Sequence, residues 1–451
     1  MKILGNVAEG LLGADAGGAI EPRLAESYRV SGGGRRLEFR LRPGAAWSDG
    51  VPVTAEDFVT AFRRAMSPAT ASKFAEFLEP VREVTGGDGM VTVELKRSVT
   101  YFLKVLALPF AAPERAGVLG SNGGRWPELG PVTGPYRIVE HRPGERIVLE
   151  PNPNSWRKPS PDAPAKVVFQ VIEDESTAVS LFGQGKLDIL TRIPSLDLPR
   201  LSAEGVVRRD PFLATYYLSF NCRVPPFDRA EWRRAVSGAI RRAEITEAVA
   251  SGETPARGWI PPRLEGHIPY TDPSAAFAPS LRRVKKEIGR SPRGEIPAAF
   301  DSSERNRVVM EKVQGDLARS LGLRIRLEPA DWKTHVARIS VDPPPIYRFG
   351  WLAPFLDPLS HLQVFVTGNA NNHSGWSNAE YDRLVARIAE LRPGPERARS
   401  IVRAQEILVD REAAVVPIYH YVQNHAVGPR VDGFRADPFG VIPLTELRVG
   451  R

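Results

Sequence analysis

The sequence predicts an α/β protein built of several lobes, and three observations support this prediction. At 451 residues, the chain exceeds the ~250–300 residues at which a single hydrophobic core stops growing. From residue 166 onward, strand-like apolar runs alternate with helical patterns, which is the order typical of α/β domains. A proline-rich break at residues 155–165 separates this part from the part before it, and we take the break as a lobe boundary.

Ahead of the break, local signals predict helices and strands in turn. The apolar period of residues 3–12 predicts an opening helix that stops at Gly13, and the alternation in residues 36–42 predicts a strand. Thr54, with Asp57 three residues later, is close to a capping box and predicts the start of an amphipathic helix.

A β-hairpin is predicted just before the break. Residues 136–140 and 146–150 alternate between apolar and polar side chains, and the turn between them contains Pro143 and Gly144. Further upstream, residues 91–95 read as a strand and residues 100–108 as an apolar helix.

After the break the predicted elements are longer. Gly322 follows an apolar helical run and predicts a C-cap, whereas Asn378 precedes such a run and predicts an N-cap. The predicted strands are residues 166–172, 186–190, 216–221, 324–328, 346–351 and 414–419, and the predicted helices are residues 175–184, 229–239, 308–321, 331–339, 380–391 and 396–409.

Composition excludes several classes of protein. The charges, 61 Lys and Arg against 53 Asp and Glu, are interspersed, and the basic run at residues 281–286 is better explained as a solvated face than as a nucleic-acid patch. That run lies in residues 275–299, which are poor in aromatics and predict a loose surface insert. A run of ~18 apolar residues that could span a membrane is absent from the sequence. Because Cys222 is the single cysteine, neither an internal disulfide nor a thiolate metal cluster is expected.

Signatures of catalysis are missing from the sequence as well. It contains no G-x-S-x-G elbow, H-E-x-x-H pair, P-loop or intact G-x-G-x-x-G. His420 and His425 are five residues apart on a predicted strand, which puts them on opposite faces and argues against a shared metal. We therefore expect neither an enzyme nor a bound cofactor.

The stretch at residues 346–382 is the best candidate for a binding site. A buried strand carries Arg348 and Trp351 to its end, and an amide-rich loop containing Asn372 follows. An aromatic wall beside convergent amides is a plausible lining for a small-molecule pocket. The alternative is an ordinary connection from strand to helix in which Trp351 belongs to the core.

Several blocks in collinear order resemble one family. They are LAESY at residues 24–28, LEFRLRPGAAWSDGVPVTAEDFVTAFRR at 37–64, TGPYRIVEHRPGERIVLEPNPNSW at 133–156, YYLSFNCRVPPFDRAEWRRAVSGAIRR at 216–242, DWKTHVARI at 331–339, YRFGW at 347–351, GNANNHSGWSNAEYDRLV at 368–385 and VVPIYHYVQNHAV at 415–427. Over nearly its whole length the chain thus resembles the extracytoplasmic solute-binding proteins of the peptide/nickel class, family 5, and most of all the oligopeptide-binding proteins of ABC importers.

This resemblance implies a class II periplasmic-binding-protein fold with three lobes that close on a ligand by hinge motion. Transferred to this chain, lobe I comprises residues 1–30, 157–245 and 425–451, lobe II residues 31–156, and lobe III residues 246–424. The family's first strand, which usually carries an L-D-P triplet, would be expected ahead of Met1.

The resemblance also implies ligand-binding residues. Trp351 corresponds to a pocket tryptophan of oligopeptide binders, and Arg348 to an arginine that can meet a peptide carboxylate as a bidentate fork. Trp332 is expected as a second aromatic near the cleft. Four further residues in the matching blocks complete the predicted site: Tyr217, Asn221, Asn372 and Tyr419. For each residue the alternative is core packing.

One departure from the family pattern concerns the ligand's amine. Where the family has an aspartate three residues after the tryptophan, this chain has Pro354, and the alternative carboxylate is Asp357. A buried ammonium without a carboxylate would cost several kcal/mol.

The resemblance therefore implies a monomeric receptor, periplasmic or on the cell surface, that captures an oligopeptide or peptide-like solute. It would deliver this solute to a membrane permease and ATPase complex and would not bind nucleic acid. The alternatives are a binder of a non-peptide solute on the same fold and the ligand-sensing module of a regulator.

Overall fold

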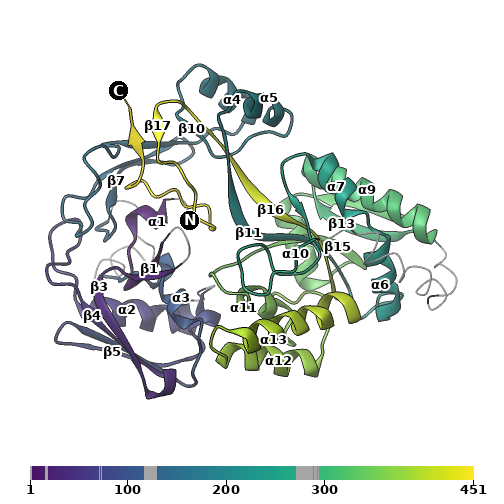
Figure 1. Ribbon diagram of the computed structural model, residues 1–451, viewed down its shortest axis with the longest axis horizontal. Helices are drawn as coiled ribbons and strands as arrows, with labels where there is room; N and C mark the ends of the chain where they lie inside the picture. Colours follow the sequence, from purple (N-terminus) through teal and green to yellow (C-terminus); the bar gives the residue numbers. More distant parts are fainter. Residues whose placement is uncertain are drawn as a thin grey trace. The chain divides into compact units, whose positions relative to one another are not determined.

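The computed structural model describes residues 3–15, 19–70, 72, 74–115, 130–270, 288, 292 and 294–450. It divides into two compact units (Figure 1). Unit 1 comprises Met1–Asp210 and Gln423–Arg451, and unit 2 comprises Pro211–Val422. The chain thus passes between the units twice, within strand β11 (Val207–Phe220) and within strand β16 (Val415–Val427). The finer division into three lobes, in which residues 211–245 belong to lobe I, stays a prediction.

The first part of unit 1 is a four-stranded antiparallel sheet with the order β3-β4-β6-β5. Its strands are β3 (Ala25–Ser31), β4 (Arg36–Leu41), β5 (Val81–Gly87) and β6 (Met90–Leu95), so the predicted strands at 36–42 and 91–95 are confirmed. Helix α2 (Ala55–Met66) packs against this sheet and buries the apolar stripe that contains Phe58 and Phe62. The capping box is confirmed, because the Asp57 carboxylate accepts the N–H of Thr54 at 2.8 Å.

The predicted opening helix at residues 3–12 is wrong for most of its length. Helix α1 covers only Leu4–Val7, and strand β1 (Leu12–Ala14) then pairs with β2 (Ile20–Pro22). The backbone of Glu9 is bound elsewhere, since its N–H donates to the Thr133 hydroxyl at 3.0 Å and its carbonyl accepts from that hydroxyl at 2.9 Å. These hydrogen bonds to Thr133 thus determine the backbone conformation here, although the local spacing of apolar residues favours a helix.

A three-stranded sheet with the order β7-β8-β9 forms the second part of unit 1. The predicted hairpin is confirmed as β7 (Tyr136–Arg142) and β8 (Arg146–Pro151), and β9 (Val167–Gln170) pairs with β8. Tyr136 and Leu149 join residues near the C-terminus, such as Ile442, in one buried core. The remaining helices and strands of unit 1 are α3 (Phe102–Leu106), α4 (Glu175–Gly183), β10 (Ile189–Leu190), α5 (Leu198–Ala203), β17 (Val431–Asp432) and β18 (Arg448–Val449).

Unit 2 is built on a mixed sheet in which β16, β11, β15, β13 and β14 are successive neighbours. Strand β15 (Ile346–Leu352) runs antiparallel to β11 and parallel to β13 (Ile296–Asp301), and β13 runs parallel to β14 (Ile325–Ala330). Helices α7 and α9 lie side by side next to this sheet (Figure 1). The helices of unit 2 include α6 (Ala230–Ala239), α7 (Arg242–Val249), α9 (Glu304–Leu321), α10 (Trp332–Val341) and α11 (Leu359–Leu362).

The caps of unit 2 largely follow the sequence signals. Gly322 ends α9 with a φ of 63°, as predicted, but α9 begins earlier than predicted because Ser303 caps it. Asn378 caps α12 (Ala379–Glu390), since its side chain accepts the N–H groups of Glu380 and Tyr381 at 2.9 and 3.0 Å. Helix α12 lies beside α13 (Pro395–Gln405), as Figure 1 shows.

Two predictions about unit 2 need correction. The helix predicted at 396–409 ends as α13 at Gln405 and continues as a π-helical segment, Glu406–Arg411. Most of the predicted insert at 275–299, with the basic run at 281–286, lies outside the described residues, but its last residues form strand β13. In the described part of the chain, no helix is both long and apolar enough to cross a membrane.

Candidate functional site

Arg348 is the charged centre of the predicted site, and β-sheet register gives it its neighbours. It lies on β15 opposite Leu218 of β11, and parallel β13 ends beside it at Asp301. Its side chain is 9% exposed. The Nη1 group donates to the Asp301 carboxylate in an ion pair, and the Nη2 group donates to the Tyr421 hydroxyl at 2.7 Å.

Aromatic rings surround this ion pair. The guanidinium carbon of Arg348 lies 4.4 Å from the centroid of the Tyr216 ring, in cation–π geometry. Tyr419 stacks on Tyr216 at 4.6 Å, and Tyr421 meets Tyr419 edge-on at 5.2 Å. Burial raises the pKa of Tyr216 and of Tyr419, so both phenols stay neutral. The predicted residues Arg348 and Tyr419 therefore belong to one cluster.

A second group of rings starts at the next residue of β15. Phe349 stacks on Trp332, with centroids 5.6 Å apart and planes 7° apart, and the His373 ring meets Phe349 edge-on at 6.2 Å. Although Trp332 is large and apolar, it is 54% exposed. An exposed indole backed by a second ring offers a flat surface on which a ligand group could stack.

The other predicted site residues make contacts within unit 2. Trp351 is half-buried, and its indole N–H donates to the Ser360 carbonyl at 2.7 Å. Tyr217 is buried and packs edge-on against Trp259 at 5.0 Å. Asn221 donates to the Pro343 carbonyl at 2.8 Å, and Asn372 donates to the Trp376 carbonyl at 2.9 Å. Ligand contact by these four residues stays a prediction, as it does for Arg348, Trp332 and Tyr419.

The alternative partner for a ligand amine already has a partner of its own. Asp357 is 2% exposed and forms an ion pair at 2.6 Å with Arg397, which is also buried. Removing either charge from such a pair would leave the other one buried and unpaired. In this structure Asp357 therefore neutralises a buried arginine of unit 2.

Sequence reasoning missed Asp301 and Tyr421. Asp301 lies 47 residues before its partner Arg348, and residues just ahead of it had been placed in a surface insert. The available signal was the apolar run of residues 296–300, which ends in an aspartate just before the helix cap Ser303. In parallel strands, such ends meet at one edge of the sheet, where binding residues gather.

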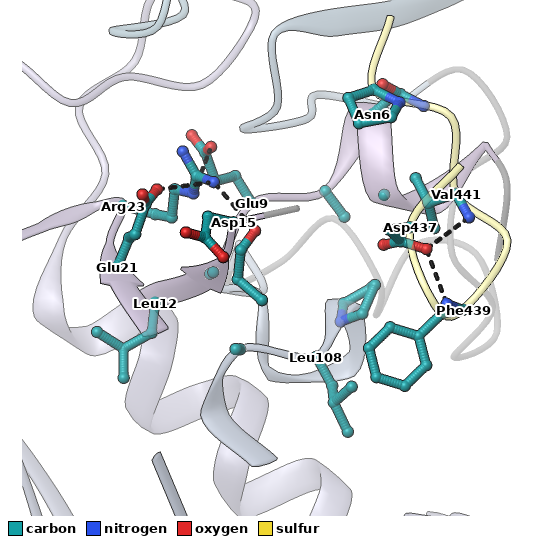
Figure 2. Close-up of a pocket in the computed structure, with 18 of the residues that line it drawn as sticks. Asn6, Glu9, Leu12, Asp15, Glu21, Arg23, Leu108, Asp437, Phe439 and Val441 are labelled. Atoms are coloured by element: carbon teal, nitrogen blue, oxygen red, sulfur yellow. Dashed lines mark hydrogen bonds and ion pairs between the residues drawn. The ribbon is translucent and has the colours of Figure 1, made fainter. Parts of the chain in front are cut away.

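Unit 1 contains a polar cavity of about 360 Å³ (Figure 2). One side of it is lined by Glu9, Asp15, Glu21 and Arg23. The other side is lined by a loop that contains Asp437, Phe439 and Val441. Burial raises the pKa of Glu9, although Arg157 lies 3.3 Å away and the Trp156 indole donates to it at 2.6 Å. These contacts tie separate segments of unit 1 together.

The buried histidines are distributed over both units. His420 of unit 2 shares a hydrogen bond with the Thr215 hydroxyl at 3.0 Å, whereas His425 of unit 1 lies 3.5 Å from the Asp210 carboxylate. Among the described residues, no group of three or more His, Cys, Asp or Glu side chains is arranged to hold a metal ion.

Comparison with known proteins gives consistent matches over the whole chain. Residues 19–373 match the family model described as "Bacterial extracellular solute-binding proteins, family 5 Middle". Among curated relatives, the periplasmic oligopeptide-binding protein OppA of Salmonella typhimurium is 28% identical over 98% of this chain and 87% of its own length. The probable deoxycholate-binding periplasmic protein YgiS of Escherichia coli is 27% identical over 96% of this chain and 86% of its own length.

Solved structures agree with these relatives. OppA of Haemophilus influenzae, in complex with the peptide RPPGFSPFR, has a TM-score of 0.84 and 26% identity, and the match covers 100% of this chain and 94% of that one. The murein tripeptide-binding protein MppA of Escherichia coli has a TM-score of 0.85 and 25% identity, with the same coverage. The predicted periplasmic-binding-protein fold is thereby confirmed. The chain belongs to family 5 of the bacterial extracellular solute-binding proteins.

Proposed function

We propose that this protein is the solute receptor of an ABC importer and that its cargo is an oligopeptide or a peptide-like molecule. The observation that carries the proposal is the match of the whole chain to a structure solved with a bound nonapeptide, OppA of Haemophilus influenzae. Several curated relatives have names that specify peptide binding, among them the OppA proteins and the dipeptide-binding protein DppE of Bacillus subtilis. The receptor would work outside the cytoplasm and pass its cargo to a permease and ATPase complex.

In this proposal, unit 2 contributes polar and aromatic contacts to the ligand. Arg348 would supply hydrogen-bond donors, and the stacked pair of Trp332 and Phe349 would supply a flat apolar surface. Trp351, Tyr217, Asn221, Asn372 and Tyr419 would shape the surroundings of these groups.

A non-peptide solute is the second candidate, and two observations favour it. Pro354 stands at the position of the expected amine-pairing aspartate, and the nearby Asp357 is committed to Arg397. Relatives of similar identity include YgiS and the heme-binding protein A of Haemophilus influenzae, whose names specify other ligands.

A thermal-shift screen separates the two candidates. The purified chain would be mixed with peptides of two to nine residues and, in parallel, with bile acids, heme and other non-peptide solutes. A ligand present at ~100 times its Kd stabilises the folded state by about 2.7 kcal/mol, which shifts the melting temperature by several degrees. A shift with peptides alone supports the proposal, and a shift with only a non-peptide solute contradicts it.

A further inference from the structure

The guanidinium of Arg348 has one donor, Nε, that finds no acceptor among the described residues. Asp301 accepts from Nη1 and Tyr421 accepts from Nη2. The Nε group is buried, and none of the described residues offers it a hydrogen-bond partner. An unpaired buried N–H costs free energy, so an acceptor atom supplied by a ligand would gain more here than at a solvated donor.

The surroundings restrict how such an acceptor can approach. The Tyr216 ring covers one face of the guanidinium at 4.4 Å. All five N–H bonds of an arginine lie in the guanidinium plane. An acceptor for Nε must therefore come in within the guanidinium plane, along the edge that Nε shares with Nη2. The Tyr421 hydroxyl is bound at Nη2, and the Asp301 carboxylate is bound at Nη1, across the group.

Asp301 balances the charge of the Arg348 guanidinium. One of its oxygens pairs with Arg348, and the other accepts from the Asn306 side chain at 2.8 Å, which fixes the carboxylate in place. The ion pair carries no net charge. A ligand carboxylate at Nε would bring a second negative charge to a guanidinium whose charge Asp301 already balances, whereas a neutral carbonyl oxygen would satisfy Nε without adding charge.

We propose that Asp301 is a specificity-determining residue, which makes Arg348 select an uncharged acceptor of the ligand, such as an amide carbonyl, over a free carboxylate. This inference rests on the proposed function, in which Arg348 faces the ligand. It predicts that peptides with an amide at the end held by unit 2, or longer peptides that present an internal carbonyl there, are the preferred cargo.

Calorimetric titration with matched peptides tests the proposal. Two forms of one peptide, ending in a carboxylate or in a carboxamide, are titrated into the wild-type chain and into Asp301→Asn. The matched control is Asp410→Asn, because Asp410 is also an aspartate of unit 2 in an ion pair, at 2.8 Å from Arg257. If Asp301→Asn does not fold, Asp301→Ser is used in its place, because it removes the same negative charge.

We expect the wild type to bind the carboxamide at least as tightly as the carboxylate. In Asp301→Asn the ratio of the two affinities should shift at least tenfold toward the carboxylate, and in Asp410→Asn it should not change. An unchanged ratio in Asp301→Asn, with both peptides still bound, overturns the role of Asp301 and leaves the proposed function standing. If neither peptide form binds to the wild type or to the variants, the peptide function itself is wrong and the inference falls with it.

Discussion

Arg348 shows at the scale of one residue what sequence can and cannot predict. Its place on a strand next to an aromatic-rich segment was visible, and the family resemblance assigned it a role. Its counter-ion was not visible, because Asp301 is brought to it only by the parallel pairing of β13 with β15. The ion pair changes the chemistry expected from the arginine, since a lone guanidinium attracts carboxylates and a neutralised one offers mainly hydrogen bonds.

Replacing this arginine tests whether it meets the ligand. We expect Arg348→Ala to weaken ligand binding at least tenfold, because hydrogen bonds to charged groups contribute about 1.5–3 kcal/mol. Calorimetry with a ligand identified by screening measures the loss. Arg257→Ala, which breaks the ion pair with Asp410 in the same unit, is the control. Unchanged affinity in Arg348→Ala would exclude the residue from the site.

His361 gives a prediction about pH. It is fully buried edge-on to Trp259 at 5.3 Å, and burial lowers the pKa of its imidazole from 6.5 to about 3. Between these two pH values the unfolded chain binds a proton at this position and the folded chain does not, so stability from this group is present above pH 6.5 and is lost on acidification.

The variant His361→Gln isolates this effect. The free energy of unfolding of the wild type, relative to His361→Gln, should fall as the pH drops from 6.5 toward 3. Each pKa unit is worth about 1.4 kcal/mol, so the fall should reach a few kcal/mol. Denaturant titrations across this range measure it, with the partly exposed His141→Gln as the control. A difference that does not vary with pH would refute the assignment.

At the scale of elements, the features that depend on neighbouring residues were predicted correctly, and a feature that depends on a distant residue was not. The caps at Thr54, Gly322 and Asn378 were predicted because each acts within a few residues of chain. The opening segment was misread as a helix because Thr133, more than a hundred residues away, binds the backbone of Glu9. A pattern confined to ten residues carries no information about such a partner.

The cap of α12 offers a direct test at this scale. Asn378→Ala removes an acceptor of two backbone N–H groups and should lower the free energy of unfolding by about 1 kcal/mol, the usual value of an N-cap. Denaturant titration measures the change. Ser377→Ala, at the exposed position just before the cap, should have a much smaller effect. Equal effects of the two substitutions would mean that the cap adds no stability.

At the scale of the molecule, the fold was predictable because the resemblance extends over nearly the whole chain. Collinear blocks indicated the family, and the family model and the solved structures confirmed it. The ligand was less predictable, because relatives of nearly equal identity have names that specify peptides, deoxycholate or heme. On a shared fold, specificity is set by a few side chains, and we propose that Asp301 is one of them.

Native mass spectrometry shows whether this receptor carries a peptide. The purified chain is measured first under gentle conditions and then under denaturing conditions, so that any molecule released on unfolding is identified by its mass. We expect the unfolding chain to release a set of co-purified peptides. Release of a single non-peptide molecule would contradict a peptide cargo. So would a protein that is empty as purified and binds only a non-peptide solute.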